Sequence, residues 1–298
     1  MSENNNKKII RKVSINTIIA NALLSALKLI VGILAKSTSL ISDAVHSLSD
    51  IFTTFIVMFG AKISTKESDN THEYGHEKFE AITSFVLGVL LAITAIIIGY
   101  TGIKSLITGT FKNNKETNFL YFALFSAILS IVVKGLMFFY TTRHAKKIKS
   151  NSLKADAWHH LSDSLSSIGT VLGIIGLIVG KGMEILDPIA AIIIAIIILK
   201  VVYDILKSAV DQLVDKSISP DLAMEMEDFI RLQNGVIDIA LFKSRQFGNK
   251  IYIDLEIYVD RTLSIVEANN IAETIHNNLE EKYKDIKHCT IWAKPKMQ

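Results

Sequence analysis

Hydrophobic residues in this chain fall into six long runs that short polar segments separate. Each run is close to the roughly 20 residues that an α-helix needs to cross a bilayer. The pattern therefore predicts an α-helical membrane protein with six transmembrane helices, forming a domain over residues 13–213 that follows a polar, basic tail at 1–12. The six runs lie at about 13–35, 38–60, 80–107, 118–140, 152–180 and 185–207.

Residues 214–298 alternate charged and apolar positions in the manner of a small soluble domain. The periods and turn residues predict the order αββαβ, with Asp221 and Ser264 as starts of the two helices and Gly248 with Asn249 in a hairpin. We expect a small α+β sandwich. Its helices are expected at 220–232 and 264–283, and its strands at 236–246, 250–259 and 287–293.

The lysine and arginine residues of the short loops predict the orientation in the membrane. The N-terminal tail and the loops after the second and fourth runs are rich in these residues, and the other loops are poorer. Because positive loops stay in the cytoplasm, we expect a multi-pass protein of the cell (plasma or inner) membrane with both termini cytoplasmic.

Composition narrows the possible functions. Half of the 298 residues are hydrophobic, and the net charge of +3 is too small to indicate a nucleic-acid partner. Cys289 is the only cysteine, which excludes an internal disulfide and a thiolate zinc cluster. Any transition metal must therefore be held by histidine and carboxylate.

The second and fifth runs share one motif. Residues 43–50 and 156–163 both read D-A-x-H-x-L-S-D. The two runs occupy the middle of successive three-helix halves, which are expected to cross the membrane in opposite directions. This pattern indicates an inverted repeat, an arrangement that places the binding site of many transporters near the bilayer midplane.

Each copy of the motif carries a histidine and an aspartate at i and i+4, which lie on one helix face. Two imidazoles and two carboxylates suit a tetrahedral divalent ion, zinc first. The loaded cage is formally neutral, which lowers the cost of burying it in hydrocarbon. The predicted ligands are His46, Asp50, His159 and Asp163. Hydrogen bonding between helices is the alternative role for these side chains.

Two further sets of residues could act beside this cage. Asp43 and Asp156 lie one turn from the ligands, where a carboxylate either orients a ligand imidazole as a second-shell group or sits at an aqueous mouth. In the loop after the second run, Asp69, His72 and His76 are either a second, more exposed metal site or ordinary solvated residues.

These motifs resemble those of the cation diffusion facilitator family over nearly the whole chain. The resemblance rests on both HxxxD pairs, the DxxHxxxH loop, Asp187 with Pro188, and the αββαβ tail. It implies a homodimer in the lipid bilayer that exchanges cytosolic divalent metal for protons, with a metallochaperone-like cytoplasmic domain and no catalytic residues. The cage of four is then the transport site.

The resemblance also assigns residues outside the cage. It implies that Asp69, His72 and His76 bind metal, and that Lys78 and Asp215 form a salt bridge linking the membrane and cytoplasmic parts. The two-histidine, two-aspartate set resembles the zinc-preferring branch. Co²⁺, Cd²⁺, Fe²⁺ and Mn²⁺ stay possible cargoes, because an N/O cage selects weakly among these ions.

The tail departs from the family pattern. Some members hold a zinc pair there, and only Asp254 among the corresponding residues could bind metal. We therefore expect no zinc pair in this domain. The corresponding positions are Ala240, Asp254, Asn269, Trp292 and Lys294.

A histidine must lose its proton to bind metal, so metal and proton compete for His46 and His159. This competition predicts proton-coupled export by alternating access. Two other functional classes would use the same ligands. A membrane-embedded metalloenzyme is disfavoured because four protein ligands leave no open position for water and no HExxH motif is present. A membrane metal sensor is the third alternative.

Overall fold

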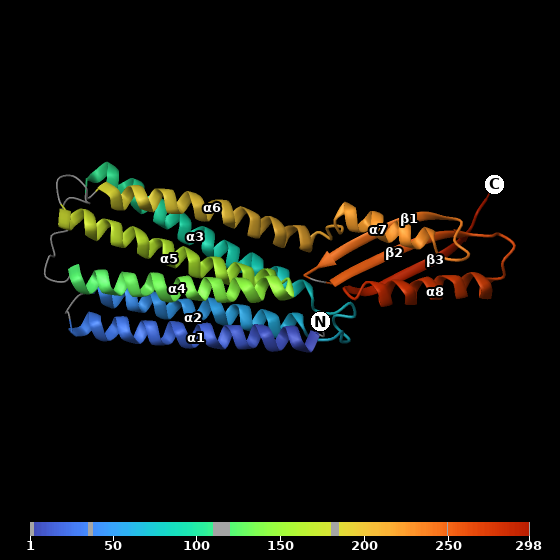
Figure 1. Ribbon diagram of the computed structural model, residues 1–298, viewed down its shortest axis with the longest axis horizontal. Helices are drawn as coiled ribbons and strands as arrows, with labels where there is room; N and C mark the ends of the chain where they lie inside the picture. The colour runs from blue at the N-terminus through green and yellow to red at the C-terminus, as the bar shows by residue number, and fades with distance from the viewer. Residues whose placement is uncertain (1–2, 35–37, 110–119, 180–184, 249, 298) are drawn as a thin grey trace. The chain divides into compact units, whose positions relative to one another are not determined.

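The computed structural model describes residues 3–34, 38–109, 120–179, 185–248 and 250–297 (Figure 1). The chain divides into two compact units, Met1–Val210 and Asp211–Gln298. The division lies close to the domain boundary expected between residues 213 and 214.

The first unit is a bundle of long helices (Figure 1). Helix α1 packs along α2, and α4 packs along α5. Helix α3 contacts both α2 and α5, and α2 also touches α5. The helices are α1 (Glu3–Leu34), α2 (Thr38–Ser64), α3 (Lys78–Thr108), α4 (Leu120–Ile148), α5 (Asn151–Val179) and α6 (Leu186–Leu213).

Helix α1 begins at Glu3, so it runs through the tail that was expected to precede the membrane domain. Ile10 and Val13 are buried in the bundle core, at 5% and 0% exposure. These two residues stand three apart and share one helix face, which ties the polar segment into the helix. The predicted boundary at residue 12 is therefore not a structural one.

Five helical stretches among the described residues are long and apolar enough to cross a membrane. They lie in α1, α2, α3, α4 and α6, and they identify a helical membrane protein. The described side chains of α5 do not include such a stretch. The count of six transmembrane helices therefore stays a prediction.

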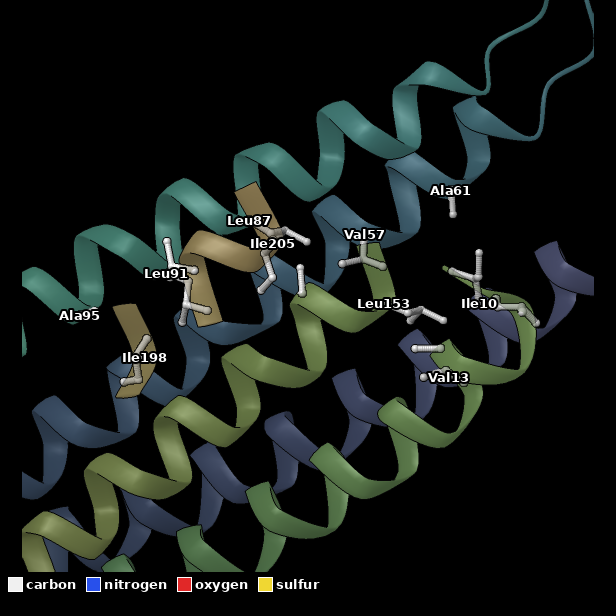
Figure 2. Packing of buried hydrophobic residues seen from close by; sticks show 14 of the residues in the cluster. Ile10, Val13, Val57, Ala61, Leu87, Leu91, Ala95, Leu153, Ile198 and Ile205 are labelled. Carbon is white, nitrogen blue, oxygen red and sulfur yellow. The ribbon is translucent and has the colours of Figure 1, made fainter. Parts of the chain in front are cut away.

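A cluster of buried apolar side chains fills one end of the bundle (Figure 2). Leu87 and Leu91 of α3 lie beside Ile198 and Ile205 of α6. The cluster extends to Ile10, Val13, Val57, Ala61 and Leu153, which lie where α1 and α5 begin and α2 ends. Apolar side chains therefore pack the helices together from the middle of the bundle toward this end.

The second unit has the predicted element order, αββαβ. Strand β2 lies in the middle of a three-stranded sheet, antiparallel to β1 and parallel to β3. Helix α8 makes the crossover that a parallel pair requires. The elements are α7 (Pro220–Arg231), β1 (Asp238–Phe247), β2 (Lys250–Val259), α8 (Ile265–Lys282) and β3 (Ile286–Pro295).

The helix starts of this unit differ in how well they were predicted. Ser264 is the N-cap of α8 and forms a capping box with Glu267. Helix α7 starts at Pro220 after the N-cap residue Ser219, so Asp221 lies in its first turn and does not begin it. Proline fits the first helical position because its missing N–H would have no partner there.

Buried apolar residues on β2 and both helices make the core of the second unit. Leu255 and Ile257 are fully buried among side chains from α7 and α8. Cys289 of β3 also lies in this core at 2% exposure, and burial raises the pKa of its thiol to about 12. The thiol is therefore protonated at physiological pH.

Candidate metal-binding site

Polar faces of α2 and α5 meet inside the first unit. His159 Nε2 of α5 lies 3.5 Å from Asp50 Oδ1 of α2 and 3.9 Å from Asp163 Oδ2 of its own helix. The side chain of Asp50 is 3% exposed, and that of Asp163 is 10% exposed. Carboxylates from two helices thus share one nearly dry space with an imidazole.

His46 completes the predicted set from the more open side. One ligand atom each from His46, Asp50 and Asp163 lie within 4.8 Å of one another. Ion-to-ligand bonds of about 2.0–2.2 Å would join these atoms after small side-chain movements. Three of the four predicted ligands thus share one centre, and His159 adjoins it through Asp50 and Asp163.

Helix α4 adds a residue that the sequence analysis missed. Lys134 Nζ lies 2.5 Å from Asp50 Oδ2 and 2.8 Å from Asp163 Oδ2, and the side chain is 2% exposed. The ammonium group bridges the two carboxylates. A sequence signal existed, because Lys134 stands alone in the middle of an apolar run, and ionisable residues inside membrane segments are rare and functional.

A cavity of about 510 Å³ reaches this centre. From Asp50 and Asp163 it extends past His46 on α2 and Thr170 on α5. Helices α2 and α5 run in opposite directions (Figure 1). His46, which precedes Asp50 in α2, and Thr170, which follows Asp163 in α5, therefore both lie toward the end of the bundle where α2 begins. The apolar cluster of Figure 2 occupies the other end. The centre is thus approached from one side.

Asp156 lies beside a histidine other than the predicted ligand His159. Its carboxylate is fully buried and lies against His160 Nε2 at 3.6 Å, while Thr54 Oγ1 donates to it at 3.4 Å. Asp156 stands four residues before His160 and three before His159, and the four-residue pair is the one that meets. The side chain of Asp43, the other expected second-shell residue, lies outside the described residues.

The loop between α2 and α3 gathers its own three candidate ligands. His72 Nδ1 and His76 Nε2 each lie 3.6 Å from a carboxylate oxygen of Asp69. Ligand atoms of all three lie within 4.8 Å of one another. The hydrogen bond from Lys66 holds the pKa of Asp69 well below its usual range. Asp69 is therefore ionised, as a metal ligand must be, and its carboxylate is paired with the ammonium group of Lys66.

Comparison with known proteins decides the family. Residues 14–214 match the family model of the cation efflux transmembrane domain, and residues 218–296 match that of the cation efflux protein, cytoplasmic domain. The chain belongs to the cation efflux family. It is an efflux transporter of divalent metal cations, and the expectation that it is not an enzyme fits this membership.

Several members of the cation efflux family are similar over most of their length. The uncharacterized transporter MJ0449 of Methanocaldococcus jannaschii is 38% identical over 91% of this chain and 93% of its own. The manganese efflux system protein MneP of Bacillus subtilis is 30% identical over 97% of both chains. The magnetosome protein MamB of Magnetospira sp. is 28% identical over 89% of this chain and 88% of its own.

Two sequence predictions for this cation efflux protein remain: the salt bridge between its two domains and the absence of a zinc pair in the cytoplasmic domain. Lys78 is the first residue of α3 and Asp215 belongs to the second unit, so their salt bridge stays a prediction. Lys294 pairs with Glu256 across β3 and β2 at 2.5 Å. A cation therefore stands where some relatives place a metal ligand, and Asp254 remains the one residue of the predicted set that could bind metal.

Whether Asp69, His72 and His76 of the loop bind metal can be tested by counting the metal ions bound per chain. We expect His76→Ala to remove one bound Zn²⁺ per chain, because His76 is the most buried of the three loop candidates, at 5% exposure. Metal content after equilibrium dialysis is the measurement. His288→Ala removes an exposed imidazole of β3 and should leave the count unchanged. An unaltered count in His76→Ala would remove the loop from the binding sites.

Proposed function

We propose that this transporter exports a divalent first-row transition metal, zinc first, in exchange for protons. One observation carries the proposal: ligand atoms of His46, Asp50 and Asp163 lie within 4.8 Å of one another, and His159 Nε2 lies 3.5 Å from Asp50. Such a centre inside a membrane domain is costly unless an ion uses it. The cavity that reaches it supports a transport role.

The identity of the metal follows from the donor atoms. His46 and His159 offer imidazole nitrogens, which favour Zn²⁺ in a four-ligand site together with two carboxylates. Co²⁺, Cd²⁺ and Fe²⁺ accept the same donors. Manganese is the second candidate, because MneP is named a manganese efflux protein and is similar over 97% of this chain. The oxygens of Asp50 and Asp163 are ligands that Mn²⁺ prefers.

Exchange for protons rests on the chemistry of the imidazoles. A metal ion binds only neutral histidine, so loading releases protons and protonation expels the ion. Access from one end, with apolar packing at the other, supports alternating access in which the opposite end opens to load metal. We further propose a homodimer with both termini cytoplasmic. The match of residues 218–296 to the cytoplasmic-domain model of the family supports the dimer.

The test uses the purified full-length protein in liposomes with a pH gradient. We expect Zn²⁺ flux that rises with the gradient, and less flux of Mn²⁺ when both ions are supplied together. Faster Mn²⁺ flux would reverse the order of the two metals. Asp163→Ala should abolish the flux of both ions, because it removes a carboxylate of the centre. Flux that ignores the pH gradient would contradict proton exchange.

A further inference from the structure

The ammonium group of Lys134 bridges the two carboxylates of the centre, and metal–proton exchange at the histidines does not require it. Its Nζ lies within 2.8 Å of one oxygen from each of two carboxylates that also face the predicted histidine ligands. The lysine comes from α4, outside the two helices that carry the repeated motif. It is therefore a third element of the centre.

The ammonium and a divalent ion would use the same two carboxylates. A metal bound to Asp50 and Asp163 would lie about 2.0–2.2 Å from each carboxylate, between the two oxygens where Nζ now lies. A cation of charge +1 and one of charge +2 at this separation would repel strongly. Metal binding therefore requires the ammonium to leave both carboxylates.

We propose that Lys134 is a tethered internal cation that competes with the transported metal for Asp50 and Asp163. This inference rests on the proposed transport function. The lysine lowers the affinity for the cargo because the fraction of molecules with free carboxylates limits binding. It also compensates the two carboxylates when the ion has left, which a buried pair of negative charges requires.

The cavity offers room for the displaced side chain. Lys134 lines it, and so do the hydroxyl-bearing residues Ser130 and Ser162. A lysine has a flexible four-carbon stem and three donors, so Nζ can leave the carboxylates and still form hydrogen bonds. The movement would carry a positive charge into the passage that the ion uses, and this charge would oppose return of the ion.

Binding affinity distinguishes a competitor from a structural lysine. With full-length protein in detergent at one fixed pH, we expect Lys134→Met to bind Zn²⁺ at least tenfold more tightly than wild type. Lys134→Gln, which keeps a polar group without the charge, should shift affinity in the same direction. Lys134→Arg keeps the charge and should not tighten binding. A lysine that only supports the fold would weaken binding when replaced.

Lys28→Met is the matched control. Lys28 also lines the cavity at 2% exposure, and it donates to Ser47 Oγ at 2.9 Å. It is a second buried lysine of the same cavity, and its described hydrogen bond goes to a serine. We expect its Zn²⁺ affinity to stay within threefold of wild type. Equal tightening in both variants would show a general charge effect and overturn the specific role of Lys134.

A measurement on the wild-type chain keeps the inference testable if the variants fail to fold. Saturating Zn²⁺ should raise the labelling of Lys134 by a small amine-reactive reagent severalfold, read by mass spectrometry, because the ammonium moves into the cavity. Unchanged labelling would overturn the inference.

The inference and the proposed function fail in different ways. These binding tests use chains that also carry His76→Ala, so that Zn²⁺ bound by the loop does not contribute. If Asp163→Ala then retains the Zn²⁺ binding of its parent chain, the centre is not the metal site and both fail. If Asp163→Ala loses binding while Lys134→Met and Lys134→Gln bind no more tightly than wild type, the transport site stands and Lys134 is not a competitor.

Discussion

Asp50→Asn is expected to reduce metal flux on the order of 100-fold or more. Asp50 contributes oxygens to both neighbours in the centre, the imidazole of His159 and the ammonium of Lys134. Loss of groups that merely support metal ligands costs about 10–100-fold, so loss of a ligand should cost at least as much. Asparagine keeps the size of the side chain, which isolates the charge. Flux of Zn²⁺ and Mn²⁺ into everted membrane vesicles is the measurement.

The neighbouring residue provides the control for this variant. Ser49 precedes Asp50 in α2, is exposed, and donates to the carbonyl of Val45 in its own helix at 3.1 Å. Ser49→Ala should therefore transport like wild type. Wild-type flux in Asp50→Asn, at equal protein levels, would show that the α2 carboxylate is not a ligand and would leave the shared centre unsupported.

Leu255→Ala is expected to lower the free energy of unfolding of the second unit by about 2–5 kcal/mol, the usual cost of a cavity left by a buried leucine. Leu255 lies in the middle strand at 0% exposure, between side chains of both helices. Hydrogen exchange of the β2 amides in the full-length protein reports this opening.

An exposed aliphatic residue of the same unit is the matched control. Ile265, at the start of α8, is 88% exposed, and Ile265→Ala should change the free energy by less than about 0.5 kcal/mol. Equal protection of the β2 amides in wild type and Leu255→Ala would mean that β2 is not the centre of the core.

The second unit was largely predictable because its signals are local. Strand β2 has the predicted bounds, and the Ser264 capping box lies within four consecutive residues. The start of α1 was missed because a polar segment with few apolar residues looks like a tail until the partner of Ile10 is known. Local pattern alone could not supply that partner.

The candidate site shows the same limit. The repeated motif predicts that His159 and Asp50 belong to one site, because the same residue pattern occurs in both helices. Lys134 stands in no repeat, and its partners lie 84 and 29 residues away on other helices. Asp156 has two histidines within reach along its helix, and only the packing of the helix decides which one it meets.

The sequestered thiol of the second unit makes the natural chain suitable for site-directed labelling. Cys289 is the sole cysteine, and its buried, protonated state should keep it silent toward maleimides while the protein is folded. Cysteines placed singly along the passage or among the apolar side chains at the other end of the bundle can then report solvent access on either face. No native residue has to be removed first.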